Sequence, residues 1–364
     1  MHALRLWRAY TPLAVPELQG VGGGQATAEL RGGVVEPFIA WMLVHLVLAA
    51  LGTWLARVYA LKRQLVDQPG ERRSHSIATP RGGGIAIVVT VLLGCVWLAV
   101  AWPEHRLLLL AYAVGLLLVA GVGWLDDHRS LSPWPRLAVQ ATAGLILAAA
   151  THFTTQAWLP GIAAFLLVMV LVNVWNFMDG IDGLAASQAA LVAGGIALVM
   201  VPGPFSWLAV GLVAATCGFL PFNFPKARIF LGDVGSGALG YLLAGLMVAA
   251  LLSPGVTWPL LFLPLAAFLV DAGFTLCGRM LRGDRWWTPH VSHLYQQLAR
   301  DRAGHKLITV AYAVFTLAGA FIMFTGVNLS LTGAMILTVG WYVMATCIWV
   351  MANKEFCMGN GAQP

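Results

Sequence analysis

Acidic residues stand in short clusters along an otherwise apolar sequence, and two of them are adjacent. Asp126 and Asp127 follow the apolar run Leu107–Trp124 and precede Ser132 and Pro133, which are typical of the cap and the first position of a helix. We therefore place the Asp pair on the connection before that helix. Adjacent carboxylates repel each other unless a cation or a proton lies between them, and their hard oxygens suit Mg²⁺. The alternative is an ordinary solvated turn.

A second cluster repeats polar residues at every third position where an apolar run ends. It consists of Asn173, Asn176, Asp179 and Asp182. The two asparagines share a helix face, and a glycine after each aspartate lets the backbone turn so that both carboxylates face one place. Polar groups against apolar residues are costly unless something binds them, which favours a binding site. A helix-terminating cap would explain only one of the aspartates.

Two glycine-rich segments are candidates for anion binding. In Phe230–Gly237, Asp233 stands directly before another apolar run, so backbone N–H groups at that helix start can hold a phosphate while Asp233 holds a metal. Asn223 lies shortly before this segment. The first basic connection ends in Arg81 and three glycines, which we interpret as a second anion cradle. Its alternative is a basic stop signal at the membrane.

Two histidines lie in the basic segment 281–307, three positions apart. The spacing of His290 and His293 is that of half a zinc site, but this segment contains no cysteine. Contact with phosphate or proton handling near neutral pH is the interpretation we favour, with zinc as the alternative.

The elements that must position these clusters are membrane-spanning helices. Of the 364 residues, 59% are hydrophobic and only 10% are charged, whereas about a quarter are charged in soluble proteins. Many apolar runs approach the roughly 20 residues that cross a bilayer. We predict an all-α polytopic integral membrane protein with about eleven transmembrane helices. The expected spans are 37–58, 83–101, 107–124, 136–152, 157–174, 184–201, 204–221, 236–252, 258–280, 308–326 and 329–350.

Lysine and arginine separate the connections between these spans into two sets. The connections 153–156, 202–203, 253–257 and 327–328 contain neither residue, and 102–106 contains only Arg106. The other set is long and basic, which predicts that it is cytoplasmic, with the N-terminus outside and the C-terminus inside. The net charge of +6 is then a topology signal and does not indicate nucleic-acid binding. We expect an extension without ordered structure over 1–36, one catalytic domain over 37–352 and a cytoplasmic tail over 353–364.

These blocks together resemble the polyprenyl-phosphate N-acetylhexosamine-1-phosphate transferases. The family's D-x-P-x-x-R-x-x-H…P-x-x-G-G signature matches Asp67 to Gly84, and its Asp pair matches Asp126 and Asp127. Its N-x-x-N-x-x-D-G-x-D-G-L block matches Asn173 to Leu184, and its F-x-G-D-x-G-S block matches Phe230 to Ser236. The resemblance runs over about residues 40 to 326.

The resemblance implies roles that the residues alone do not give. Asp233 would be the main Mg²⁺ ligand, with Mn²⁺ as a substitute, and Asp126 or Asp127 would activate the lipid phosphate. Asn223, Phe230 and the region of Asp179 and Asp182 would hold the uridine. The substrate-binding set implied in full is Asn173, Asn176, Asp179, Asp182, Asn223, Phe230, His290, His293, Arg72, His75 and Arg81. Asp271 matches a family aspartate near the end of its helix and would support the site indirectly.

The implied reaction takes place at the bacterial cytoplasmic membrane. Sugar 1-phosphate would pass from a UDP-sugar to undecaprenyl phosphate, giving UMP and a lipid-linked sugar. The peptidoglycan-precursor branch carries adjacent histidines where this chain has His290-x-x-His293, so the branch that starts O-antigen and related surface glycans is favoured. Membrane lipids and a second copy of the chain are further expected partners. A transporter is the rival function, but it would place charges near mid-membrane and broken helices in two matching halves.

Overall fold

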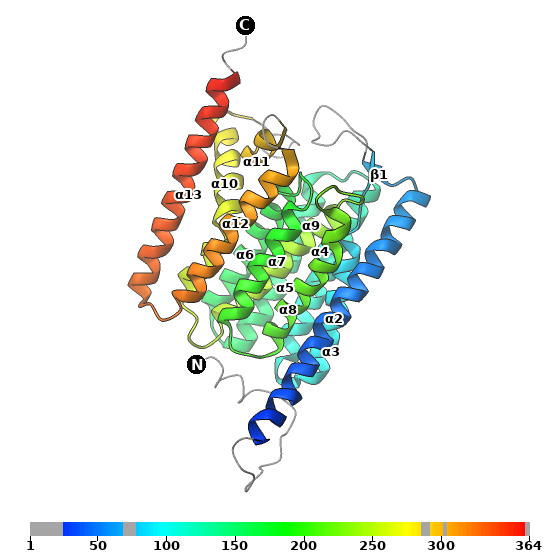
Figure 1. The fold of residues 1–364 in the computed structure, drawn as a ribbon, viewed down its shortest axis with the longest axis vertical. Helices are drawn as coiled ribbons and strands as arrows, with labels where there is room; N and C mark the ends of the chain where they lie inside the picture. Colours follow the sequence, from blue (N-terminus) through cyan, green and yellow to red (C-terminus); the bar gives the residue numbers. More distant parts are fainter. Residues whose placement is uncertain (1–24, 68–77, 285–291, 301–303, 361–364) are drawn as a thin grey trace.

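The protein is a bundle of membrane-spanning helices (Figure 1). The structure, a computed structural model, describes residues 25–67, 78–284, 292–300 and 304–360. Within these ranges nine helices are long and apolar enough to cross a membrane, and two shorter apolar helices stand at the two remaining predicted spans. The prediction of an all-α polytopic membrane protein is therefore confirmed.

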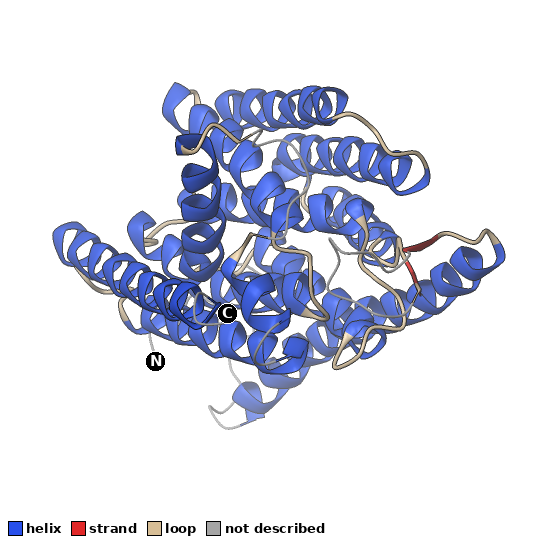
Figure 2. Ribbon diagram, turned by 90° about the horizontal axis from the view of Figure 1, so that it is seen from above, coloured by secondary structure: helices blue, strands red, loops and turns tan. Residues whose placement is uncertain are grey.

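The described elements run from α2 to α13 in chain order. They are α2 (Gln25–Lys62), β1 (Val66–Asp67), β2 (Thr79–Pro80), α3 (Ile85–Ala101), η1 (Pro103–His105), α4 (Arg106–His128), α5 (Pro133–Thr155), α6 (Trp158–Phe177), α7 (Leu184–Val199), α8 (Pro204–Asn223), α9 (Asp233–Leu251), η2 (Trp258–Leu265), α10 (Ala266–Leu281), α11 (Leu294–Leu298), α12 (Gly304–Thr325) and α13 (Leu331–Asn360). The strands form a two-stranded antiparallel hairpin at the end of α2 (Figure 2).

Three boundaries differ from the predicted ones. α2 begins at Gln25, so part of the expected extension is helical, and α13 continues to Asn360, into the expected tail. The span predicted over 258–280 is broken into the 3₁₀ helix η2 and the α-helix α10. Pro259 and Pro264 explain the break, because proline lacks the N–H that an α-helix needs and clashes with the preceding turn.

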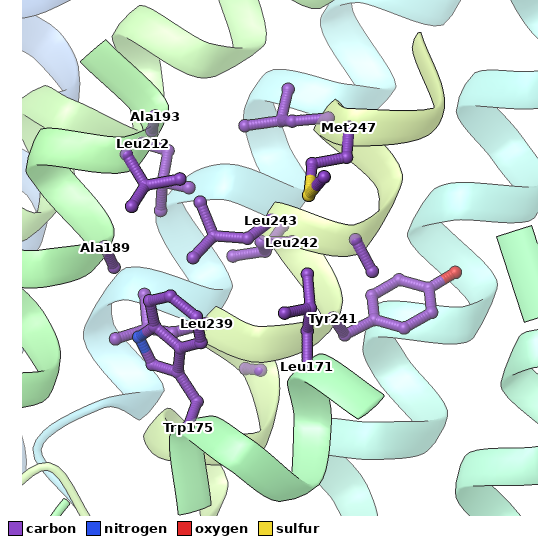
Figure 3. Packing of buried hydrophobic residues seen from close by; sticks show 14 of the residues in the cluster. Leu171, Trp175, Ala189, Ala193, Leu212, Leu239, Tyr241, Leu242, Leu243 and Met247 are labelled. Carbon is purple, nitrogen blue, oxygen red and sulfur yellow. The ribbon is translucent and has the colours of Figure 1, made fainter. Parts of the chain in front are cut away.

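The helix α9 is the centre of the bundle, because almost all of its residues are buried. Its side chains pack against α6, α7 and α8 (Figure 3). Small residues let its neighbours approach closely: a Cβ on Gly240 would collide with the carbonyl of Leu171, and one on Gly245 would collide with the ring of Tyr112. Such close approach through small residues is typical of helices packed in membranes. The first residue of this central helix is Asp233.

Candidate active site

The polar clusters of the sequence meet at one end of the bundle. The helices α4 and α6 end there, α5 and α9 begin there, and the turns 178–183 and 224–232 connect helices at the same end. This end also carries the β1–β2 hairpin and α11, at the top of Figure 1. Residues far apart in the chain therefore contribute to one polar site.

Arg136, in the first turn of α5, holds three polar side chains together. Its Nη1 donates to Asp126 Oδ2 at 2.5 Å, and its Nη2 lies 3.1 Å from Asn176 Oδ1 and 3.4 Å from Asp233 Oδ1. Asp126 is only 7% exposed, and its other oxygen accepts the Leu131 N–H at 2.6 Å. A buried carboxylate requires such partners, because an unpaired charge is costly away from water.

Asp127 points to a different helix from its neighbour. Its two carboxylate oxygens accept the N–H groups of Asp233 and Val234, both at 3.1 Å. Arg81 donates to the Asp127 carbonyl, and its Nε lies 3.9 Å from Asp127 Oδ1. The expectation of a phosphate at the start of α9 is therefore wrong for these N–H groups. A helix start attracts an anion, and here the protein's own carboxylate is that anion.

Two of the three glycines after Arg81 donate hydrogen bonds to the segment that precedes α9. Gly83 donates its N–H to Phe230 O at 2.9 Å, and Gly84 donates to Leu231 O at 2.8 Å. A Cβ on Gly84 would collide with the backbone of Gly235. The anion cradle expected at these glycines is wrong, because they instead admit the turn that leads into α9.

The Asp pair lies in the last turn of α4, and not on the connection before α5. The expected position is wrong because α4 continues past Leu125 and ends only at His128. Carboxylates at a helix C-terminus are disfavoured by the helix dipole, so the contacts with Arg136 and with the start of α9 are what stabilise them there. Ser132 and Pro133 do occupy the cap and first position of α5, although the Ser132 side chain makes no cap bond.

The two asparagines of α6 connect this helix to its neighbours. Asn176 Nδ2 donates to Asp233 Oδ1 at 2.5 Å and to Ser236 Oγ at 3.1 Å. Asn173 lies one turn deeper, and its Nδ2 donates to Gln140 Oε1 at 2.9 Å. Asn176 therefore fixes the Asp233 carboxylate directly, while Asn173 joins α6 to α5.

The turn after α6 separates the two aspartates that the sequence predicts to face one place. Asp182 Oδ2 lies 3.3 Å from Nδ1 of His305 in α12, and Thr309 donates to the Asp182 carbonyl at 2.8 Å. Burial raises the pKa of Asp179 well above its ordinary value, and the negative charges of Asp233 and Asp127 raise it further. Asp179 is therefore close enough for the charges of Asp233 and Asp127 to act on it, whereas Asp182 contacts α12.

Asn223 and Phe230 lie on either side of the turn before α9. Asn223 is buried, its Oδ1 accepts the Gly183 N–H at 2.9 Å, and its Nδ2 donates to Ile229 O at 3.0 Å. Its amide thus ties together the two turns that carry Asp179 and Asp233. Phe230 is half-buried and donates its N–H to Pro80 O at 2.8 Å. Their contact with a uridine stays a prediction.

The histidine segment is held to α10 by Asp271. His293 is buried, and its Nδ1 lies 4.0 Å from Asp271 Oδ1. Burial lowers the pKa of His293, against a raising effect of Asp271, and the charge of Arg279 lowers it further. Arg72, His75 and His290 lie outside the described residues.

Comparison with known proteins identifies the family. The model described as glycosyl transferase family 4 matches residues 109–251, a range that includes Asp126, Arg136 and Asp233. A phospho-N-acetylmuramoyl-pentapeptide-transferase of Synechococcus sp. (strain JA-2-3B'a(2-13)) is 34% identical over 246 residues, which cover 60% of this chain and 69% of that protein. The chain belongs to glycosyl transferase family 4. The resemblance stated from the sequence motifs is therefore confirmed.

Two further relatives are similar over more of the chain. A probable undecaprenyl-phosphate N-acetylglucosaminyl 1-phosphate transferase of Bacillus subtilis (strain 168) is 28% identical over 301 residues, covering 77% of this chain and 82% of that protein. A decaprenyl-phosphate N-acetylglucosaminephosphotransferase of Mycobacterium tuberculosis (strain CDC 1551 / Oshkosh) is 28% identical over 346 residues, covering 81% and 84%. All three relatives are named as transferases, two of them with a prenyl phosphate in the name.

Asp233 is the partly exposed carboxylate of the acidic group, and binding of Mg²⁺ there stays a prediction. In the described part of the chain, no three His, Cys, Asp or Glu side chains form a metal-binding group. Mg²⁺ usually binds through only one or two carboxylates together with substrate phosphates. Asp233 is 28% exposed, and the pKa of Asp179 is raised partly by the charge of Asp233. The donor set therefore fits a divalent cation beside Asp233.

Arg136 and His305 are the members of this site that sequence reasoning missed. Arg136 follows the helix-start residues Ser132 and Pro133 and is the first charged residue of an otherwise apolar helix, which was an available signal. His305 lies at the start of α12, and its partner Asp182 lies far away in the sequence. No local spacing could have indicated that contact.

Proposed function

We propose that this protein transfers an N-acetylhexosamine 1-phosphate from a UDP-sugar to undecaprenyl phosphate. A phosphate oxygen of the lipid would attack the β-phosphorus of the UDP-sugar, the bond to the UMP oxygen would break, and the products would be UMP and a lipid pyrophosphate sugar. The names of the relatives in Bacillus subtilis and Mycobacterium tuberculosis support this reaction class. These relatives do not support the rival function of a transporter.

The observation that carries the proposal is the grouping of Asp126, Arg136, Asn176 and Asp233 at the end of apolar helices. Phosphoryl transfer depends mainly on positioning and on neutralising charge. A guanidinium can bind a phosphate itself. Because Arg136 also contacts two carboxylates and an amide, it fixes the oxygens that would bind a metal. Such a cluster would be costly in a protein that used it only for structure.

We assign Mg²⁺, with Mn²⁺ as a substitute, to Asp233. When bound, the ion would neutralise the charge that develops on the pyrophosphate and on the leaving UMP. Asn176 orients the Asp233 carboxylate through its hydrogen bond at 2.5 Å. Asp179, whose pKa is raised by burial and by the neighbouring acids, would be the group most relieved by a nearby cation.

Direct attack by the lipid phosphate is favoured over a covalent intermediate on the Asp pair. Both oxygens of Asp127 accept N–H groups of α9, and those of Asp126 accept Arg136 and Leu131. A carboxylate engaged in this way is less available as a nucleophile, whereas a phosphate oxyanion beside a dication already is one. Asp126 would then hold Arg136, and Asp127 would hold the start of α9.

We further propose an orientation, neighbours, a donor and a product for this reaction. The active site would face the cytoplasm of a bacterium, where UDP-sugars are made, and membrane lipids and a second copy of the chain would be its neighbours. The donor would not be the muramyl-pentapeptide nucleotide, because this chain lacks adjacent histidines at His290 and His293. UDP-N-acetylglucosamine and UDP-linked 6-deoxy-N-acetylhexosamines are the candidates, and the product would start O-antigen or another surface glycan.

The test is UMP release by the purified protein. It would be assayed with undecaprenyl phosphate, Mg²⁺ and a panel of UDP-sugars that includes the muramyl-pentapeptide nucleotide. We expect UMP only when the lipid, the metal and one N-acetylhexosamine donor are all present. Release of UMP from none of the donors, with folded protein in the same membranes or detergent, would contradict the proposed function.

A further inference from the structure

Asp271 is a carboxylate inside a membrane-spanning segment that the proposed reaction does not use. It lies in α10 and is 0% exposed. An ionisable residue at such a position is costly and usually has a function. The helix α11 and the turn after α6 lie between Asp271 and the group around Asp233. The contacts of α11 therefore indicate what the function of Asp271 is.

Five donors from four helices surround this carboxylate. Asp271 Oδ1 accepts the Leu294 N–H at 2.9 Å, and Oδ2 accepts the Tyr295 N–H at 3.1 Å, so that both oxygens hold the first turn of α11. The side chains that complete the set are Tyr312 of α12 at 2.8 Å, Trp349 of α13 at 3.2 Å and Thr275 of α10 at 3.3 Å. A buried charge with this many donors is stabilised and fixes the groups around it.

The helix α11 in turn contacts the turn that carries Asp179. Tyr295 is buried and donates its hydroxyl to Phe177 O at 3.0 Å, at the end of α6. A Cβ on Gly180 would collide with the Tyr295 hydroxyl and would lie 2.7 Å from Gln296 Nε2. The backbone after Asp179 is therefore in close contact with two consecutive side chains of α11. A shift of α11 by a fraction of an ångström would move this turn.

We propose that Asp271 is a positioning residue of the active site. It holds α11 against α10, α12 and α13, and through Tyr295 and Gln296 it sets the position of the Asp179–Gly180 turn beside Asp233. The inference rests on the proposed function in that the positioned turn is taken to bind the nucleotide. The proposal also extends to the last two helices, because Tyr312 of α12 and Trp349 of α13 donate directly to Asp271.

The experiment uses mild changes, because Asp271→Ala would leave two backbone N–H groups buried without an acceptor and could prevent folding. Tyr312→Phe and Trp349→Phe each remove one donor to Asp271; the first keeps the ring, and the second replaces the indole by a smaller aromatic ring. The matched controls are Tyr342→Phe and Trp341→Phe in α13. Tyr342 donates to Phe262 O at 2.9 Å and Trp341 to Leu263 O at 3.0 Å, so each control loses one comparable hydrogen bond away from Asp271.

Two measurements separate positioning from general stability. Hydrogen exchange of the segment 292–300 should accelerate about fivefold or more in Tyr312→Phe and Trp349→Phe, in line with loss of one typical hydrogen bond. It should not change in the two controls. The dissociation constant for UMP, which every UDP-sugar donor would yield, should rise by about the same factor in the first pair only.

Each outcome decides the inference. Equal exchange of 292–300 in Tyr312→Phe and Tyr342→Phe would show that Asp271 does not anchor α11. Faster exchange with an unchanged dissociation constant for UMP would show an anchor without a positioning role. Both results overturn the proposal. If the unaltered protein released no UMP from any donor, the proposed function would fail, while exchange and UMP binding would still decide whether Asp271 positions a nucleotide site.

Discussion

Replacing Arg136 by methionine tests whether the charge at the centre of the site supports the reaction. The guanidinium lies 2.5 Å from Asp126 Oδ2 and 3.4 Å from Asp233 Oδ1, and it also contacts Asn176 Oδ1. Methionine keeps a long side chain and a high helix propensity in α5. The substitution therefore removes the charge and the hydrogen bonds while changing the local packing little.

The expected magnitude follows from how far the pair is buried. Removing one partner of a fully buried ion pair costs about 3–5 kcal/mol, whereas an exposed pair contributes about 0–1 kcal/mol. The Arg136 side chain is 24% exposed and that of Asp126 is 7% exposed, so the pair lies between these limits. We expect the reaction barrier to rise by a comparable amount, about 2 kcal/mol, because the same displaced carboxylates would face the substrate; this corresponds to a decrease of about thirtyfold in kcat/KM. Arg136→Lys keeps the charge but cannot reach three acceptors, and we expect a decrease of about fivefold.

The assay is UMP release at subsaturating UDP-sugar by protein purified in detergent. Arg106→Met is the matched control, because Arg106 lies at the opposite end of α4 and donates only to Ala99 O, at 3.2 Å, among the described contacts. Melting temperatures of all variants would confirm folding. If kcat/KM of Arg136→Met stayed within about twofold of the unaltered protein, a change of only about 0.4 kcal/mol, the reasoning would be refuted.

Four further predictions concern the metal, the topology, the pH dependence and the route of the reaction. Asp233→Asn should lower turnover by at least about a hundredfold, or about 2.7 kcal/mol, because it removes the metal ligand's charge; near-normal Mg²⁺-dependent turnover would count against that assignment. Single cysteines at Pro202 and Arg129, with the native cysteines removed, should react with impermeant reagents from opposite sides of the membrane; reaction of both from one side would contradict the orientation. Because the pKa of His293 is lowered in the folded protein, the unfolded state binds more protons below about pH 6.5, and stability should fall as the pH decreases; melting curves of His293→Gln should show a smaller acid loss, and an unchanged one would be inconsistent with burial of a neutral imidazole. UDP-sugar without lipid should give no stoichiometric burst of UMP, and a burst that Asp127→Asn abolishes would instead establish a covalent route.

The membrane fold was predictable because its signal is local. Each apolar run is long enough to be recognised by itself, and all eleven predicted spans coincide with an apolar helix of the described chain. At the span predicted over 258–280, the prediction was inaccurate because proline was overlooked. Pro259 and Pro264 interrupt the span that contains Asp271, and their effect on an α-helix is a local one that could have been anticipated.

The residues of the site were predictable, but their partners were not. Asp126, Asn176 and Asp233 stand out because they are polar residues next to apolar runs. Their contacts join positions 40, 57 and 97 residues apart in the chain, and only the packing of α4, α5, α6 and α9 brings them together. Arg136 did have a signal, a charge at the start of an apolar helix, but that signal alone does not separate an arginine that serves topology from one that serves a site.

The two adjacent aspartates show why neighbours in sequence can differ in role. Successive residues of an α-helix point about 100° apart around its axis. In the last turn of α4, Asp126 therefore faces α5 and contacts Arg136, while Asp127 faces α9 and accepts its first N–H groups. Asp233 belongs to both arrangements, since its backbone N–H bonds to Asp127 and its carboxylate lies 3.4 Å from Arg136. Asp127 thus holds Asp233 by its backbone, and Asp126 holds the Asp233 side chain indirectly through Arg136. Together they fix the position where the proposed reaction needs a metal ligand.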